Sequence, residues 1–96
     1  MSKSFTRDSN DYERSADILR VLGHSIRLQI IYKLIRTGPL NVSELWRTVE
    51  LPQSTVSQHL NKLKLLKLVS YERKGLEVYY RVDNPTVIKI IKILRL

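Results

Sequence analysis

Four segments in the first two thirds of the chain have apolar residues every three or four positions, the period of an α-helix. They cover residues 12–22, 26–36, 42–49 and 51–63. Ser25 and Asn41 are expected to cap the second and third helices at their N-termini. Gly23 and Gly38 are expected to end the first and second, because glycine tolerates the left-handed conformation common at helix ends. Residues 1–11 are polar and predict a flexible N-terminal arm.

The period changes to two after Leu66, which is typical of strands. Residues 69–74 and 77–82 alternate apolar and polar side chains and predict a β-hairpin. Asn84 and Pro85 then form a helix start, and residues 86–96 predict a last helix. The expected fold is therefore mainly α with a small β-hairpin: a winged helix-turn-helix that forms one domain over residues 12–96.

The fourth helical segment combines a narrow apolar stripe with an unusually polar remainder. Val56, Leu60 and Leu63 form the stripe, and no acidic residue occurs between residues 51 and 66. Ordinary exposed helix surface mixes acidic and basic side chains, so this composition favours a helix that lies in a DNA major groove. The alternative is a solvent-exposed helix without a ligand. The polar side chains expected to reach DNA from this helix are Gln53, Ser54, Thr55, Ser57, Gln58 and Lys62.

Positive charge is concentrated next to this helix. The chain carries 17 Lys and Arg against 9 Asp and Glu, a net charge of +8, which favours nucleic acid as a partner ahead of a membrane surface. Residues 58–81 contain six of the basic residues and only two acidic ones. Arg73 and Lys74 lie beside Gly75 at the predicted hairpin tip, where they can approach a phosphate backbone. They can equally protect the sheet edge from pairing with another sheet.

The last helix is apolar over more than half of its circumference, which is more apolar surface than one side of a small core can cover. This pattern predicts a homodimer in which the first and last helices meet their copies. The alternative is a last helix buried in its own domain. The residues expected at the dimer interface are Ile18, Leu19, Leu22, Val87, Ile90, Ile91 and Leu94.

Other chemistry has little support in the composition. The chain has no cysteine, and no cofactor or metal is predicted. His24 and His59 belong to no paired-ligand motif. His24 is expected to have a structural role. Two roles are open for His59: a contact to DNA phosphate, or a place in a network that couples to the dimer. No catalytic motif is present, so an enzyme is not expected. No apolar run approaches the roughly 18 residues of a membrane span, and a cytoplasmic protein is expected.

These patterns carry a resemblance to a known family. The segment from Ala16 to Leu28 and the runs LPQSTVSQHL and ERKGLEVYY together resemble the ArsR/SmtB winged-helix transcriptional repressors over residues 17–96. The resemblance implies a homodimer that binds an inverted-repeat DNA operator in the bacterial cytoplasm, at the nucleoid. It also implies DNA-contacting positions on the helix and the wing, which here are Gln53, Ser54, Ser57, Gln58, Arg73 and Lys74.

Two departures from the family pattern concern metal sensing. Many members bind metal through Cys-Val-Cys at the start of the third helix, where this chain has Asn41-Val42-Ser43. Others place Asp and His on the last helix, which here has neither after Asp83. Neither Asn nor Ser replaces a thiolate for a soft metal. The chain therefore resembles members that lack the metal-binding cysteines, and its effector is left open.

A second class of function also stays open. A winged-helix interaction module that has lost DNA readout would use its apolar helices to bind and antagonise another protein complex. The polar side chains of the fourth helix and the basic side chains of the wing favour the DNA-binding repressor.

Overall fold

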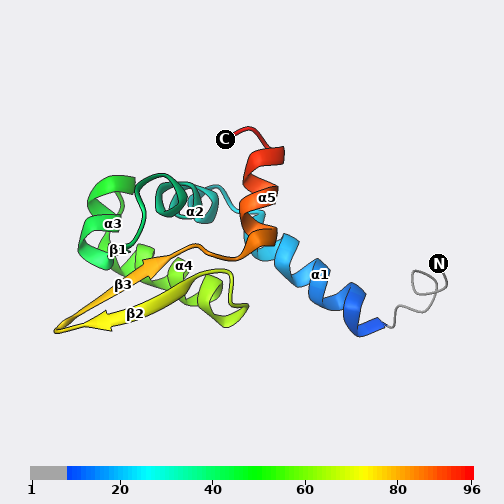
Figure 1. Cartoon of the computed structure of the whole chain (residues 1–96), viewed down its shortest axis with the longest axis horizontal. Helices are drawn as coiled ribbons and strands as arrows, with labels where there is room; N and C mark the ends of the chain where they lie inside the picture. Colours follow the sequence, from blue (N-terminus) through cyan, green and yellow to red (C-terminus); the bar gives the residue numbers. More distant parts are fainter. Residues whose placement is uncertain (1–8) are drawn as a thin grey trace.

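The computed structural model describes residues 9–96 and arranges them as helices α1 to α5 with three short strands (Figure 1). The helices are α1 Ser9–Leu22, α2 Ser25–Thr37, α3 Val42–Val49, α4 Gln53–Leu65 and α5 Pro85–Ile93. The strands are β1 Leu40–Asn41, β2 Ser70–Lys74 and β3 Glu77–Arg81. Helices α3 and α4 form the helix-turn-helix and the β2–β3 hairpin forms the wing, so the predicted winged helix-turn-helix is confirmed.

The hairpin belongs to a three-stranded antiparallel sheet with the order β1-β3-β2. Strand β1 pairs with β3 through Leu40 opposite Tyr80, an interaction that the sequence pattern did not predict. Two residues are too few to reveal a period of two, which is why this strand was missed. Because β1 immediately precedes α3, the pairing fixes the wing relative to the helix-turn-helix. The hairpin turns at Gly75, whose φ of +64° favours glycine.

The core lies between the end of α1, helices α2 to α5 and the inner face of the sheet. Its buried apolar side chains are Leu22, Ile30, Ile31, Leu34, Leu45, Val56, Leu60, Leu63, Leu68, Val69, Tyr80, Val87 and Ile91. The stripe predicted for α4 is fully buried, since Val56, Leu60 and Leu63 are each at most 1% exposed. Helix α4 therefore has one face fixed in the core and the opposite face available for contacts.

Several predicted helix ends are confirmed. Asn41 accepts a hydrogen bond from the Glu44 backbone N–H at 2.8 Å, and the Glu44 side chain accepts one from the Asn41 backbone N–H at 2.9 Å. This reciprocal capping box opens α3. Asn84 caps α5 with Pro85 in its first turn, and Gly38 ends α2 with a φ of +87°.

Two other helix ends differ from prediction. The N-cap of α2 is His24, not Ser25, because the His24 Nδ1 atom accepts a hydrogen bond from the Ile26 backbone N–H at 3.2 Å. Gly23 follows α1 without adopting a left-handed conformation. A Cβ atom at Gly23 would lie 3.1 Å from the Leu19 carbonyl oxygen, so the close approach of the backbone is what favours glycine there.

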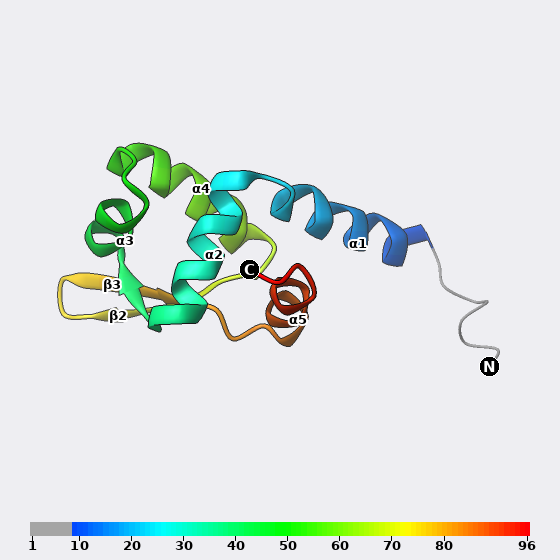
Figure 2. The same cartoon turned by 90° about the horizontal axis from the view of Figure 1, so that it is seen from above.

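The two terminal helices lie at the same end of the molecule, opposite the hairpin tip (Figures 1 and 2). Helix α1 begins at Ser9, within the segment predicted to be a flexible arm, and residues 1–8 of that segment lie outside the described residues. Residues 9–16 are all exposed, so the first half of α1 projects away from the body. Helix α5 ends at Ile93, earlier than predicted.

Candidate nucleic-acid interface

The outer face of α4 is a stripe of exposed side chains opposite the core. Ser54, Gln58, Asn61 and Leu65 follow one another at intervals of four, three and four residues, which places them along one line of the helix. Gln53 is also exposed in the first turn, and Ser57 is half-buried on the flank of the stripe. Four of the predicted DNA-contacting side chains thus lie on or beside one outward surface.

Two further predicted contacts lie on the other flank of α4. Thr55 is half-buried, and Lys62 is exposed but borders a cavity that α4 shares with α1 and α2. Lys62 shares this lining with Arg20 and Arg27. A role for Thr55 and Lys62 in DNA contact stays a prediction.

The wing carries its basic side chains at an exposed tip. Arg73 and Lys74 end β2 and are both exposed, and the Lys74 Nζ atom lies 5.8 Å from the centroid of the Tyr79 ring. The hairpin tip lies at the same end of the molecule as α3 in both views (Figures 1 and 2). The two basic side chains are thus free to meet a ligand beyond the edge of the protein.

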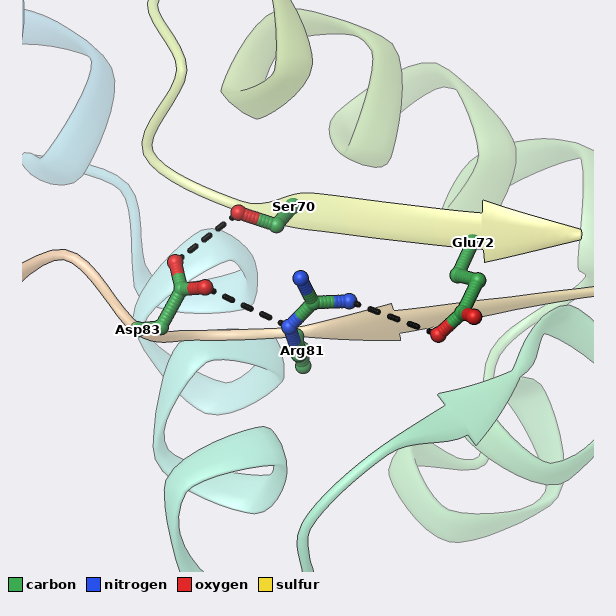
Figure 3. Close-up of polar contacts among 4 residues, drawn as sticks. All are labelled: Ser70, Glu72, Arg81 and Asp83. Carbon is green, nitrogen blue, oxygen red and sulfur yellow. Dashed lines mark hydrogen bonds and ion pairs between the residues drawn. The ribbon is translucent and has the colours of Figure 1, made fainter.

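The base of the wing is held by a polar cluster (Figure 3). Asp83 accepts hydrogen bonds from the Ser70 Oγ atom at 2.8 Å and from the Arg81 Nε atom at 3.3 Å. Arg81 also lies 3.9 Å from the Glu72 carboxylate. The hydrogen bond from Ser70, assisted by the charge of Arg81, lowers the pKa of Asp83 below its usual 3.8. Arg81 is therefore engaged with acidic groups, which leaves Arg73 and Lys74 as the wing's exposed cations.

A groove between the end of α4 and β2 was missed by the sequence reasoning. It has a volume of about 620 Å³. Its lining residues include Asn61, Lys64, Lys67, Ser70 and Tyr71. The Lys64 Nζ atom lies 4.5 Å from the centroid of the Tyr71 ring. Lys64 follows Ser57 by seven positions, which is two helical turns. The helical period alone therefore places Lys64 on the same flank of α4 as Ser57, and this signal could have found it.

The two histidines meet at the junction of α2 and α4. The ring centroids of His24 and His59 are 4.6 Å apart, and the Arg27 Nη1 atom lies 3.4 Å from the His59 Nδ1 atom. Partial burial, together with His24, Arg27 and Lys62, lowers the pKa of His59 below 6.5. The structural role predicted for His24 is confirmed by its helix cap. His59 contacts His24 and Arg27 of its own chain. The sequence had left its role between a phosphate contact and a network that couples to the dimer, and both remain predictions.

The residues predicted for the dimer interface fall into two groups. Leu22, Val87 and Ile91 are buried in the core of a single chain, so they have almost no surface to offer a partner. The residues of both groups are apolar and lie on or next to the same two helices, α1 and α5. The sequence alone therefore did not separate core residues from interface residues. The others are accessible: Leu19 and Leu94 are exposed, and Ile18 and Ile90 are half-buried. Ile18, Leu19 and Ile90 line a groove of about 200 Å³ between α1 and α5.

The start of α3 is occupied by a capping interaction. Asn41, which stands where the resemblance places a metal-binding cysteine, uses its side-chain oxygen to bind the Glu44 N–H. Within residues 9–96, no three His, Cys, Asp or Glu side chains are grouped closely enough to hold a metal ion. No helix in that part of the chain is long and apolar enough to span a membrane.

Comparison with known proteins identifies the family. Residues 24–71 match the family described as bacterial regulatory protein, arsR family. The chain belongs to the arsR family. It is 44% identical over 82 residues to the transcriptional repressor PagR of Bacillus anthracis, a match that covers 85% of this chain and 82% of PagR.

Solved structures of arsR-type regulators have the same fold. The crystal structure of PagR superposes with a TM-score of 0.82 at 41% identity and covers 91% of this chain and 99% of that one. NolR from Sinorhizobium fredii gives a TM-score of 0.83 at 34% identity, covering 88% and 84%. Mb0332 from Mycobacterium bovis, described as a homodimeric winged helix-turn-helix DNA-binding domain, gives 0.84 at 26% identity, covering 94% and 82%.

Proposed function

We propose that this arsR-family chain is a dimeric transcriptional repressor that binds an inverted-repeat DNA operator. The observation that carries the proposal is the outer face of α4, which is polar up to Leu65, free of acidic residues and flanked by the basic wing. Amide and hydroxyl side chains on such a face can bond base edges in a major groove, and lysine and arginine on a wing can bond phosphates. PagR, which is named a transcriptional repressor, and Mb0332, which is described as a homodimeric DNA-binding domain, both support the proposal.

In this mechanism the dimer reads two half-sites. The α4 helices enter successive major grooves, about 34 Å apart on one side of the duplex, and each wing contacts flanking backbone. The groove lined by Lys64 and Lys67, between the end of α4 and the start of β2, offers further positive charge to a phosphate strand. Repression follows from occupancy of the promoter, so the proposal asks for no catalytic step, cofactor or metal. It places the protein with DNA in the bacterial cytoplasm.

The test is binding to a fragment of the protein's own upstream region across a salt series. The logarithm of the association constant is expected to fall linearly with the logarithm of the salt concentration, with a slope of about −0.9 per phosphate neutralised. The same fragment should bind at least about 10³-fold more tightly than random DNA of equal length. A weak salt dependence without sequence preference would favour the alternative, a winged-helix module that binds another protein.

A further inference from the structure

A cavity lies on the flank of α4 that faces α1 and α2, away from the wing. It is open to solvent on one side, and its volume is about 310 Å³. Val21 and Leu66 form an apolar wall, the exposed Leu65 lies at its rim, and apolar atoms dominate the lining as a whole. The space is therefore suited to the hydrocarbon part of a small organic molecule.

Arg27 brings a buried positive charge to this cavity. Only 9% of Arg27 is exposed, and its Nε atom donates a hydrogen bond to the Val21 carbonyl oxygen at 2.6 Å. Its Nη1 atom lies 3.4 Å from the His59 Nδ1 atom. Among residues 9–96, none of the ion pairs involves Arg27. A buried guanidinium is costly without an anionic partner, and the described part of the chain supplies none.

The other charges around the cavity do not neutralise Arg27. Arg20 and Lys62 also line it, and among residues 9–96 the single acidic lining residue is Asp17. The Asp17 carboxylate is already paired with Arg20 on the same helix. The cavity thus combines an apolar wall with unneutralised positive charge from Arg27 and Lys62, which is the complement of an amphipathic anion.

We propose that this cavity binds a small organic acid. Its carboxylate lies between Arg27 and Lys62, and its hydrocarbon part packs against the apolar wall formed by Val21 and Leu66, with Leu65 at the rim. Such a ligand contacts α1, α2 and α4 together, so it changes how the DNA-facing helix is held relative to α1. Binding of the acid stands independently of the proposed DNA function, whereas its effect on DNA binding rests on that function.

The first experiment titrates the full-length protein with octanoate and, as a neutral probe of the same length, octanamide. Two-dimensional ¹⁵N–¹H NMR should show saturable shifts at Val21, Leu66 and the Arg27 side-chain N–H. Octanoate should bind at least about tenfold more tightly than octanamide, because only octanoate brings a charge to the two cations. Equal affinity for the two probes, or shifts confined to the groove around Tyr71, would overturn the proposal.

Matched variants on α4 test which lysine contacts the carboxylate of octanoate. Lys62→Gln should weaken octanoate binding about fivefold, because it removes one partly exposed charge. Lys64→Gln makes the same change two residues along the helix, in the other groove, and should leave binding unchanged. Lys62 is exposed and Lys64 half-buried, and glutamine keeps most of the length of either side chain, so both variants should fold. Equal loss in the two variants, or no loss in Lys62→Gln, would contradict the carboxylate position.

The DNA measurement separates this proposal from the proposed function. Affinity for the upstream fragment is compared with and without saturating octanoate, with octanamide as the control. A change of at least about fivefold that only octanoate produces would support regulation through the cavity. Octanoate binding without that change would overturn the regulatory part and leave the site. If the protein shows no sequence preference at all, the proposed function fails, and the NMR titration still decides whether the acid binds.

Discussion

At the scale of single residues, Gln58 is the side chain best placed to read a base. It is exposed on the outer stripe of α4, one residue before His59, and the helix beneath it is fixed by Val56 and Leu60. Gln58→Ala should weaken binding to the operator by about 1–3 kcal/mol and hardly change binding to random DNA, because a glutamine amide can bond an adenine edge. Fluorescence anisotropy with both DNAs measures the difference.

Gln29 provides the control for this change. It is exposed on α2, and Gln29→Ala removes the same amide from a helix outside the proposed interface. This variant should bind both DNAs like the unchanged protein. If Gln58→Ala loses equal affinity for operator and random DNA, Gln58 contacts only the backbone.

His59 predicts a dependence of stability on pH. Its pKa is below 6.5 in the folded chain because of partial burial and the neighbouring His24, Arg27 and Lys62. Well above pH 6.5 the ring is neutral in both states, and its contribution to stability is complete. As the pH falls below 6.5, the unfolded chain binds the proton first, so the free energy of unfolding decreases until the folded pKa is passed.

Urea unfolding followed by circular dichroism tests this dependence between neutral pH and about pH 5. The midpoint should fall over this range in the unchanged protein and fall less in His59→Gln. The same decline in both proteins, or an NMR titration that gives His59 a folded pKa above 6.5, would contradict the assignment.

At the scale of elements, the capping box at the start of α3 stabilises the helix-turn-helix. Asn41→Ala should lower the free energy of unfolding by about 1 kcal/mol, because the Glu44 N–H loses its side-chain acceptor. Ser43→Ala, in the same turn, is the matched control and should change stability by less than about 0.5 kcal/mol. Urea unfolding at neutral pH measures both, and equal losses would show that the cap contributes nothing specific.

Helices whose apolar repeat extends over several turns, or that begin with a distinctive capping residue, could be predicted from the sequence. The α4 stripe and the caps Asn41 and Asn84 were correct because their signals are local. The N-cap of α2 was misassigned because serine is the commoner cap, whereas His24 takes the position through its ring nitrogen. Strand β1 was missed because its pairing with β3 is made only in the tertiary structure.

At the scale of the whole molecule, the candidate interface could be predicted only in part. The outer face of α4 follows from the helical period, so its polar residues could be placed in advance. The junction of Arg27 with His59 joins residues 32 positions apart, and the groove beside Tyr71 depends on how the chain turns back between α4 and β2, so no periodic pattern contains either. Likewise, Leu22 and Leu19 are the same residue type on one helix, yet the first is 4% and the second 61% exposed.

This difference in exposure gives the sharpest test of the proposed dimer. Leu19→Glu should leave the fold intact, since the side chain is exposed in one chain, but it should place a carboxylate in the apolar contact between two copies. A buried unpaired charge costs about 3 kcal/mol or more, so the dimer dissociation constant should rise more than about 100-fold. Sedimentation equilibrium at micromolar concentration should then find a dimer for the unchanged protein and a monomer for Leu19→Glu.

The control for the dimer test is Leu76→Glu, which makes the same change at the wing tip. Leu76 is 94% exposed and lies at the end of the molecule opposite α1 and α5, so this variant should remain a dimer. Operator affinity of Leu19→Glu should also fall, because two half-sites bound by one dimer gain from effective concentration that separate monomers lack. If Leu19→Glu stays dimeric, the two copies pair through a surface other than α1, and the half-site spacing expected for the operator changes with it.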